Sequence, residues 1–568
     1  MKVIFAAINS KYIHTALGLR YVKEYCRKRG LNADLIEETI NTPILTVLDK
    51  LMSAQADVYA FSVHIWNKLF VYRLLGMLRK LRPEAVIIVG GPEVAFDAEK
   101  IFSEQPAIDY IIQGEGEITV ADLLISLQKQ LPPPAHVAYK RDGKTELNGG
   151  VTVIEDLSIL PFPYPDLQQV IAEHKIVYYE CSRGCPFNCS YCLSGISRSV
   201  RRRPLNLVLA DLAKFIEAGT PLVKFVDRTY NLDEEYFLPI MRYLAEADTE
   251  TVFHFEIKAD ILSPQVIEFL QKVPQGRFQL EIGIQTTNPA ALQAINRRDN
   301  WNRLAHNVRS LLQAGNMHIH LDLIAGLPYE GLYEFSQSFN DVYALQPHML
   351  QLGFLKVLPG TQMRQERAKH NLIYMEEPPY EILATAYMPY ENMRFLKQLE
   401  NIFDQTYNSG SFENILRHLL AEEKSAFAFY EHLTKWWVGK GYYPQSHNAK
   451  GVARILYEYI EENIAEEWRQ SAFIEVLRYD VFRHIAGWRP QWLNWNDETI
   501  FEKVSDFWKD ETKVQKYLPN YKFSSWRQIH KNYPIELFKV NPHTGEECNL
   551  YVMAEQIDGR TTCRIIEI

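Results

Sequence analysis

Short apolar runs alternate with amphipathic segments along the first stretch of this 568-residue chain. Up to about residue 131 the runs are Val3 to Ile8, Asp34 to Glu37, Val58 to Val63, Ala85 to Val89 and Tyr110 to Ile112. A strand, a helix and a second strand form the unit from which parallel sheets are built. The alternation therefore predicts an α/β chain that begins with a doubly wound sheet of the flavodoxin-like or Rossmann-like kind.

A second alternation of the same kind follows a proline-rich connector. The connector runs from Leu160 to Pro165, and its three prolines make it extended and stiff. The apolar runs after it are Ile176 to Tyr179, Leu222 to Val226, Val252 to Ile257, Phe278 to Ile284, His318 to Ile324 and Leu350 to Val357. Helical segments between them satisfy the crossover that parallel strands require, so we expect six strand–helix units here.

Four cysteines gather on the loop after the first strand of this second stretch. Cys185, Cys189 and Cys192 have the spacing CxxxCxxC, and Cys181 precedes them. Three thiolates at this spacing can hold three irons of a 4Fe-4S cluster and leave the fourth iron open for a ligand. The alternative is a structural zinc site with Cys181 as the fourth ligand. Zinc ligands usually come as two separated pairs, so a single loop favours the cluster. Cys181 is then either a buried thiol or an alternative ligand.

The cysteine spacing, with Tyr191 before the last cysteine, resembles the radical S-adenosylmethionine (SAM) superfamily. The resemblance implies a partial (βα)6 barrel and a 4Fe-4S cluster whose open iron binds the methionine part of SAM. One electron from an external reductant of the flavodoxin or ferredoxin type would then release a 5'-deoxyadenosyl radical. It also implies that the Tyr191 backbone meets the adenine, while Lys258 and Gln285 contact the methionine and ribose parts.

Further polar residues stand at the carboxyl ends of the expected barrel strands, where the chemistry of parallel barrels is found. They are Asp227, Arg228, Glu256, Glu281, Thr286, Asp322 and Lys356, with the loops Gly326 to Pro328 and Pro359 to Thr361. The Gly-Gly-Glu element usual in the superfamily after the second strand is replaced here by Phe225 to Arg228. The contact to the methionine amino group is therefore left unassigned.

The strand ends of the first stretch carry glycines and polar residues that let a large flat ligand approach the backbone. They are Asn9, Ser62, His64, Trp66, Asn67, Gly90, Gly91, Pro92, Glu93, Gly114, Glu115, Gly116 and Glu117. Placed before a radical SAM core, this layout resembles the cobalamin-binding domain of cobalamin-dependent radical SAM enzymes. The motif Asp-x-His-x-x-Gly, which supplies a cobalt-binding His, is absent, because Tyr12 stands two residues before His14. The resemblance then implies cobalamin with its tail detached and with His64 to Asn67 beneath the corrin. A cobalt-bound His64 is the alternative.

Composition excludes several partner classes. A net charge of −9 and a pI near 6.0 give no global attraction to nucleic acid or to anionic lipid. The local basic cluster Arg198, Arg201, Arg202 and Arg203 could serve a phosphate, a cofactor carboxylate or the cluster, or form a solvated turn. No apolar run approaches the roughly 20 residues of a membrane span, and the N-terminus lacks signal-peptide features. Seven cysteines with four in one loop argue for a reducing compartment, so we expect a cytoplasmic protein.

We expect four parts: a cobalamin-binding domain at 1–135, a linker at 136–170, a radical SAM core at 171–380 and a mostly helical domain at 381–568. The last part shows helical periodicity at Ile415 to Tyr430 and Val452 to Ala472 and ends in a hairpin of Cys548 to Met553 and Thr562 to Ile566. It also holds eight of the ten Trp residues. These could line an aromatic pocket, although large aromatics in helical domains are more often core.

The cofactors favour methyl transfer to an unactivated carbon of a small-molecule or peptide substrate. The radical would remove a hydrogen atom, and methylcobalamin would deliver the methyl group. Radical oxidation or ring formation, with cobalamin accepting an electron, fits the same cofactors. RNA methylthiolation is disfavoured because it typically needs a second cysteine-held cluster, and the N-terminal part offers only Cys26. A non-enzymatic cobalamin sensor would have no use for an open iron.

Overall fold

The computed structural model describes residues 1–196, 199–522, 525–557 and 560–568. These residues form two compact units, the first made of Met1–Ser338 with Gln351–Tyr390 and the second of Phe339–Leu350 with Glu391–Ile568. In the described ranges no helix combines the length and apolar character needed to cross a membrane.

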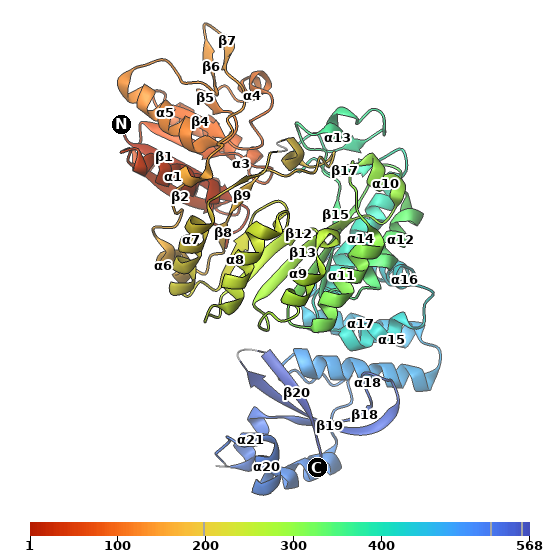
Figure 1. Cartoon of the computed structure of the whole chain (residues 1–568). Helices are drawn as coiled ribbons and strands as arrows, with labels where there is room; N and C mark the ends of the chain where they lie inside the picture. Colours follow the sequence, from red (N-terminus) through yellow and green to blue (C-terminus); the bar gives the residue numbers. More distant parts are fainter. Residues whose placement is uncertain (197–198, 523–524, 558–559) are drawn as a thin grey trace. The chain divides into compact units, whose positions relative to one another are not determined.

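The first sheet confirms the predicted α/β fold (Figure 1). Its elements are β1 (Val3–Asn9), α1 (Leu17–Lys28), β2 (Ala33–Thr39), α2 (Ile44–Ala54), β3 (Val58–Ser62), α3 (Lys68–Leu81), β4 (Val86–Gly90), α4 (Ala98–Glu104), β5 (Tyr110–Ile112), α5 (Gly116–Lys129), β6 (Val137–Arg141) and β7 (Lys144–Asn148). The strand order is β2-β1-β3-β4-β5-β6-β7, parallel from β2 to β5. In sheets of this order ligands bind at the carboxyl ends beside the reversal between β1 and β3.

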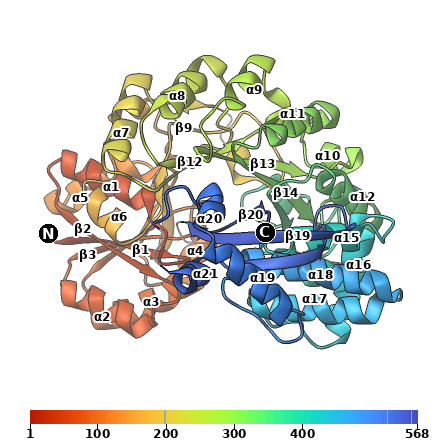
Figure 2. The same cartoon turned by 90° about the horizontal axis from the view of Figure 1, so that it is seen from below.

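Both faces of this sheet are covered, which explains its apolar strands. One face packs Val47 of α2 and Leu74 of α3 against Phe61, and the opposite face packs Val22 of α1 and Leu123 of α5. Figure 2 shows the two pairs of helices on opposite sides of the strands. The helices therefore leave the carboxyl ends of the strands as the place where a ligand could approach the sheet.

Residues 137–148 differ from the sequence prediction, which assigned them to a linker. They form β6 and β7, an antiparallel pair that extends the sheet from β5. The turn between the two strands is Asp142-Gly143, and both residues have positive φ angles, 50° and 77°. An Asp-Gly pair flanked by alternating residues is a hairpin signal, so the sequence carried this information.

The barrel is built by β8 (Val177–Tyr179), β9 (Ser182–Arg183), β10 (Arg201–Arg202), α7 (Leu205–Glu217), β11 (Leu222–Phe225), α8 (Glu234–Glu246), β12 (Val252–Ile257), α9 (Pro264–Leu270), β13 (Phe278–Gln285), α10 (Pro289–Ala294), α11 (Trp301–Ala314), β14 (His318–Ala325), α12 (Leu332–Tyr343) and β15 (Met349–Phe354). Six of these described strands form the barrel sheet in the order β8-β11-β12-β13-β14-β15, as the six predicted strand–helix units require, whereas β9 and β10 form a separate pair. The pairs from β8 to β14 are parallel. Helices α7, α8, α9 and α11 lie along its outer side (Figure 2).

The proline-rich connector covers the edge of the barrel at β8. It is flanked by the short helices η1 (Leu157–Ile159) and α6 (Leu167–Ala172). The hydroxyl of the buried Tyr164 accepts a hydrogen bond from the Tyr178 backbone N–H, 2.9 Å, and donates one to the Tyr178 carbonyl, 2.8 Å. The Thr15 hydroxyl lies 3.1 Å from the same oxygen. The connector is therefore fixed to both the first sheet and the barrel.

The rest of the first unit is short: η2 (Leu193–Ile196), η3 (Ala259–Ile261), α13 (Gln362–Gln365), β16 (Ile373–Tyr374) and β17 (Ile382–Ala384). The second unit holds α14 (Tyr390–Thr406), α15 (Glu413–Leu420), α16 (Ala426–Gly439), α17 (Ala449–Asn463), α18 (Glu467–His484), α19 (Glu498–Lys509), α20 (Glu511–Tyr517), α21 (Trp526–Asn532), β18 (Ile535–Val540), β19 (Glu547–Ile557) and β20 (Arg560–Ile566).

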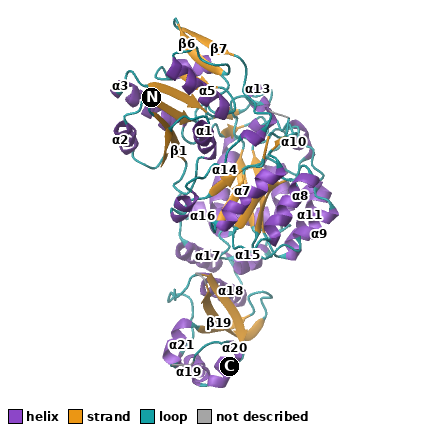
Figure 3. Ribbon diagram, turned by 60° about the vertical axis from the view of Figure 1, so that its left-hand side comes forward, coloured by secondary structure: helices purple, strands orange, loops and turns teal. Residues whose placement is uncertain are grey.

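The second unit confirms a mostly helical region with a terminal hairpin, and β18 adds a further strand to it. In Figure 3, α18 lies on one side of this sheet and α19 to α21 lie on the other. Each predicted periodic stretch is in fact interrupted, at 421–425 and at 464–466. Trp437 and Trp508 are fully buried, which places them in the core, whereas Trp468 is exposed.

Candidate active site

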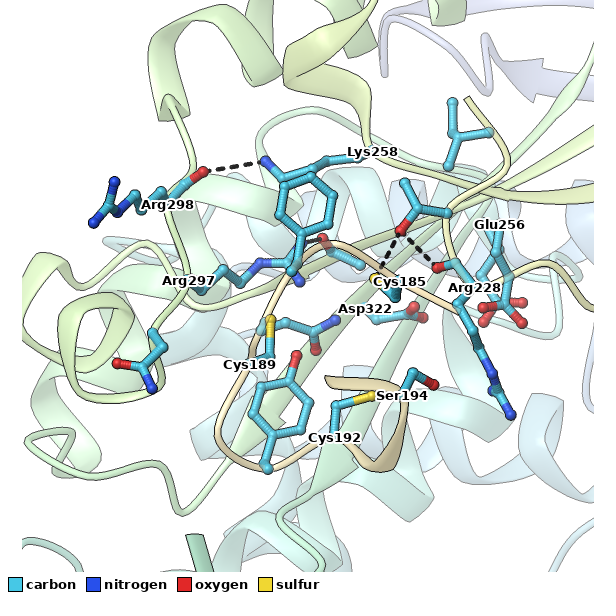
Figure 4. Close-up of a pocket in the computed structure, with 18 residues that line it drawn as sticks. Cys185, Cys189, Cys192, Ser194, Arg228, Glu256, Lys258, Arg297, Arg298 and Asp322 are labelled. Atoms are coloured by element: carbon cyan, nitrogen blue, oxygen red, sulfur yellow. Dashed lines mark hydrogen bonds between the residues drawn. The ribbon is translucent and has the colours of Figure 1, made fainter. Parts of the chain in front are cut away.

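The cysteine loop surrounds one end of a cavity at the carboxyl ends of the barrel strands. The loop lies between β9 and β10, which pair antiparallel. Its middle is fixed where the Ser190 N–H donates to the Ile295 carbonyl, 3.0 Å, and the Ser190 carbonyl accepts from the Met363 N–H, 2.8 Å. Cys185, Cys189 and Cys192 all line this cavity of about 220 Å³ (Figure 4). The loop therefore offers a donor set that fits a 4Fe-4S cluster.

Cys181 is not among the residues that line the cavity. Its thiol donates a hydrogen bond to Asp227 Oδ1, 3.1 Å, and its N–H donates to Asp227 Oδ2, 3.1 Å. Burial, and then the charge of Asp227, raise the pKa of the Cys181 thiol well above its usual value. Because a metal ligand must be a thiolate, this environment favours the reading of Cys181 as a buried thiol.

Two cations that line the cavity are held by carboxylates. Lys258, predicted to contact SAM, lies with its ammonium 2.5 Å from both Asp260 and Asp299. Arg297 donates from Nε to Asp299, 2.5 Å, and from its guanidinium to the Gly283 carbonyl. Arg297 was not among the predicted site residues. Its signal would have been the polar run from Asn296 to Asn300 between two helices.

Three carboxylates from adjacent strands line the barrel side of the same cavity: Glu256 on β12, Glu281 on β13 and Asp322 on β14. Glu281 lies 3.2 Å from His254, and Asp322 lies 3.1 Å from His320. Burial, followed by the charge of Glu281, raises the pKa of Glu256 to about 7. This acidic wall suits a cationic ligand.

Gln285 ends β13 at a register shift and has a positive φ of 73°. Its side-chain amide lies directly over Gly283, so closely that a Cβ there would overlap the amide nitrogen. Both residues line the cavity, as does Tyr191. The strand-end candidates Thr286 and Lys356 and the two Gly-Pro-containing loops are not among the lining residues. Thr286 instead donates to the buried Glu330, 2.5 Å.

A second cavity of about 740 Å³ lies at the carboxyl ends of the first sheet. Its predicted lining residues are Asn9, Ser62, His64, Trp66, Asn67, Gly90, Gly91, Pro92, Gly114, Glu115, Gly116 and Glu117. Barrel residues Tyr178, Glu180, Arg183, Val226 and Arg228 complete the lining. Its volume lies in the range of pockets that bind organic cofactors. Arg228 also lines the cysteine cavity, so the two cavities adjoin.

Glu93, which we predicted to bind the same ligand, is not part of this lining. Its carboxylate accepts a hydrogen bond from the Tyr380 hydroxyl, 2.6 Å, and lies 3.9 Å from the Lys68 ammonium. The neighbouring Gly91 is required by close approach, because it has φ 105° and a Cβ would lie 2.6 Å from the Val63 carbonyl. In the Gly-Gly-Pro-Glu element, Gly90, Gly91 and Pro92 therefore line the cavity, whereas Glu93 pairs with Tyr380 and Lys68 outside it.

The segment His64 to Asn67 is rigid. The His64 ring stacks on Trp66 with centroids 4.4 Å apart, and its Nε2 lies 2.7 Å from the Ser62 hydroxyl. Burial lowers the pKa of His64 to about 4, so the ring is neutral near pH 7. Asn67 is 1% exposed, and its amide donates to the carbonyls of Ile8 and Ser62. Asn67 therefore supports the loop, and Trp66, which is 44% exposed, is the side chain presented by it.

The Gly-Glu-Gly-Glu element is tied to the cysteine loop by ion pairs. Arg183 lies 2.6 Å from Glu117, 2.6 Å from Glu180 and 3.4 Å from Glu115, and Arg201 lies 2.8 Å from Glu115. Glu115 and Glu117 are thus structural partners as well as lining residues. In the predicted basic cluster, Arg203 pairs with the buried Asp211 and Arg202 with Asp233, and Arg198 lies outside the described residues. The cluster is therefore mostly paired within the fold.

Three parts of the chain match known protein families. Residues 3–124 match the B12 binding domain, and residues 179–342 match the radical SAM superfamily. Residues 368–554 match a family described as a protein of unknown function, DUF4080. The B12 binding domain indicates cobalamin as a cofactor, and the radical SAM domain indicates a 4Fe-4S cluster and SAM.

The relatives of this chain are distant in sequence. An uncharacterised methyltransferase of Pyrococcus horikoshii is 22% identical over 370 residues, covering 63% of this chain and 79% of the relative. The cobalamin-dependent radical SAM methyltransferase TokK of Streptomyces tokunonensis is 22% identical over 344 residues, covering 56% of this chain and 50% of the relative. The chain thus spans only half of the second relative.

A solved structure supports the fold over nearly the whole chain. The cobalamin-dependent SAM radical enzyme OxsB, with aqua-cobalamin and SAM bound, is similar with a TM-score of 0.61 and 16% identity. The match covers 94% of this chain and 84% of OxsB. The matched domains and the relatives indicate one enzyme class, and the solved structure supports the fold.

Proposed function

Since the chain belongs to the cobalamin-binding radical SAM enzymes, we propose that it transfers a methyl group to a carbon that is not nucleophilic. The observation that carries this proposal is the adjoining of the two cavities at Arg228. A substrate at the junction would lie within reach of both the source of the radical and the source of the methyl group. The substrate would be a small molecule or peptide, and an external one-electron reductant would supply two electrons for each methyl group transferred, one for the cleavage of SAM and one for the reuse of cobalamin.

When bound, the reduced 4Fe-4S cluster with SAM would supply the radical that removes a hydrogen atom from the substrate, and cobalamin would supply a methyl group taken from a second SAM. Cys185, Cys189 and Cys192 hold the cluster and leave one iron free. Arg297 and the Gln285 amide orient SAM, and the acidic wall around Glu256 attracts its sulfonium. Lys258 keeps the carboxylates of Asp260 and Asp299 in place.

Cobalamin would bind at the carboxyl ends of β1, β3, β4 and β5, where Gly91 and Gly114 line the cavity. Both have positive φ, and a Cβ at either position would collide with the chain's own carbonyl at Val63 or Thr152, so the fold of these strand ends requires glycine. Trp66 would then face the lower side of the corrin, and His64 would hold Trp66 through their stacking. His64 would not bind cobalt in this arrangement, because its Nε2 already pairs with Ser62.

The lower face of cobalt can be tested by spin resonance of the full-length protein with reduced cobalamin. We expect no nitrogen splitting of the cobalt signal, and the same signal in His64→Ala. Trp66→Ala should change the signal, because it opens the space beneath cobalt. Nitrogen splitting that vanishes in His64→Ala would show that His64 binds cobalt, and the proposal for this residue would be wrong.

The reaction itself can be tested with SAM carrying a trideuterated methyl group. The anaerobically reconstituted full-length protein, with cobalamin and reductant, is incubated with a small-molecule extract of its source cells. We expect 5'-deoxyadenosine, S-adenosylhomocysteine and one product that gains the trideuteromethyl group on carbon. Cleavage of SAM with a modified product that carries no label would instead indicate radical oxidation or ring formation. A label on oxygen, nitrogen or sulfur would exclude a carbon acceptor.

A further inference from the structure

Arg228 occupies a fixed position at the junction of the two cavities. It follows Asp227, whose carboxylate is held by the Cys181 and Ser182 donors. Its own carbonyl accepts a hydrogen bond from the Thr229 hydroxyl, 2.8 Å. The backbone of Arg228 is thus held on both sides, while its side chain is exposed and lines both cavities. Figure 4 shows Arg228 beside Glu256.

The Arg228 guanidinium differs from three other cations that line these cavities. Lys258, Arg297 and Arg183 are each paired with at least one carboxylate within 2.6 Å. Within the described part of the chain, Arg228 makes no such ion pair and no side-chain hydrogen bond. The nearby Glu256 feels its charge, yet burial keeps the pKa of Glu256 at about 7. Arg228 therefore has a charge and a planar set of donors that the fold does not use.

We propose that Arg228 binds an anionic group of the substrate, a carboxylate or a phosphate, where the two cavities meet. The inference rests on the proposed function and adds the substrate class to it. A guanidinium binds such groups with two parallel hydrogen bonds, which fix both position and orientation. The carboxylate of SAM would have other cations in the cysteine cavity, because Arg297, on the side of Cys189, and the exposed Arg298 also line it. An anion held at Arg228 would place the rest of the substrate between the two cofactors.

The test compares Arg228→Gln and Arg228→Lys with Arg309→Gln, an exposed arginine of α11 that lines neither cavity. Each full-length variant is loaded with cofactors, checked for iron and cobalamin content, and given trideuteromethyl SAM and the cell extract. With the wild type we expect the labelled product to be retained on an anion exchanger. Phosphatase treatment that releases it identifies a phosphate, and retention after treatment identifies a carboxylate.

At limiting extract we expect Arg228→Gln to form roughly 10- to 100-fold less labelled product, the effect of losing hydrogen bonds to a charged group. Arg228→Lys should recover part of it, and Arg309→Gln should match the wild type. The deficit of Arg228→Gln should shrink as the extract is concentrated, since binding is what is lost. A labelled product that is not retained, or equal yields from Arg228→Gln and Arg309→Gln, would overturn the inference and leave methyl transfer intact. No labelled product from the wild type would overturn the proposed function, and the inference with it.

Discussion

Replacement of Arg183 by Met should loosen the joint between the first sheet and the cysteine loop. Arg183 is 13% exposed in its side chain and lies 2.6 Å from both Glu117 and Glu180. Removing one partner of a buried ion pair costs about 3–5 kcal/mol, because the remaining charges are left buried without compensation. At about 1.4 kcal/mol per factor of ten, local opening should become roughly a hundredfold to four-thousandfold more frequent.

Hydrogen exchange followed by mass spectrometry measures this opening directly in the full-length protein. The peptides that cover residues 113–118 and 180–184 should exchange faster in Arg183→Met by the factor given above. Arg417→Met is the matched control, because Arg417 pairs with Glu413 while both side chains are about half exposed. Exposed pairs contribute about 0–1 kcal/mol, so these two peptides should keep their exchange rates in the control.

The pH dependence of the defect has a fixed sign. Burial raises the pKa of Glu180, and the charge of Arg183 counteracts this rise. Without Arg183 the folded-state pKa of Glu180 moves further above its unfolded value, so the ionised form costs more stability as pH rises. After correction for intrinsic exchange, the defect should be largest at high pH and should shrink as pH falls. Converting Glu117 and Glu180 to Gln in the same chain should restore most of the protection. Unchanged exchange in both peptides of Arg183→Met would refute the reasoning.

Four further outcomes concern the cysteine cavity. Cys189→Ala should lose the cluster absorbance and all SAM cleavage, and Cys181→Ser should keep both; activity that survives in Cys189→Ala would contradict the cluster assignment. The KM for SAM should fall as pH rises through about 7, because Glu256 then ionises, and Glu256→Gln should have a KM roughly tenfold higher without this step. The raised pKa of Glu256 also means that its charge costs stability as pH rises from 4.5 to about 7, so Glu256→Gln should be the more stable protein above that range in thermal unfolding. Gly283→Ala should displace the neighbouring glutamine amide and raise the KM for SAM by about tenfold with little loss of stability. Gly76→Ala, which meets open space inside helix α3, should leave the KM unchanged and raise the stability by about 1 kcal/mol.

The sequence predicted the two parallel sheets because apolar runs and helical segments alternate regularly. It missed β6 and β7 because polar residues dominate Lys144 to Asn148, and only the Asp142-Gly143 turn marked the hairpin. The helical breaks at 421–425 and 464–466 were also missed, because periodicity continues across them. Local patterns therefore predicted elements well where burial is continuous, and poorly at polar edges and breaks.

The site was predictable where its residues are close in sequence. The cysteine motif marks the cavity by itself, but the role of Arg297 depends on a strand, a loop and Asp299 meeting in space. The same applies to Glu93, whose place in a glycine-rich element suggested a ligand contact, whereas its carboxylate accepts a hydrogen bond from a tyrosine 287 residues away. Partners that are distant in sequence decide which polar side chains remain free to bind a ligand. Such partners cannot be read from a local sequence motif.

The hydroxyl of Tyr164 has a consequence for how this protein behaves when it is concentrated. The strand β8 stands at the end of the barrel sheet, where an exposed backbone edge can template pairing with another chain. One phenol oxygen satisfies both the N–H and the carbonyl of Tyr178, and residues 13–15 pair with Ile176 at the start of the same edge. Tyr164→Phe would keep the aromatic packing but leave the N–H and the carbonyl of Tyr178 without a hydrogen-bond partner. The connector therefore also protects the β8 edge from pairing with another chain. Light scattering that rises more steeply with concentration in Tyr164→Phe than in the wild type would show that this protection is lost.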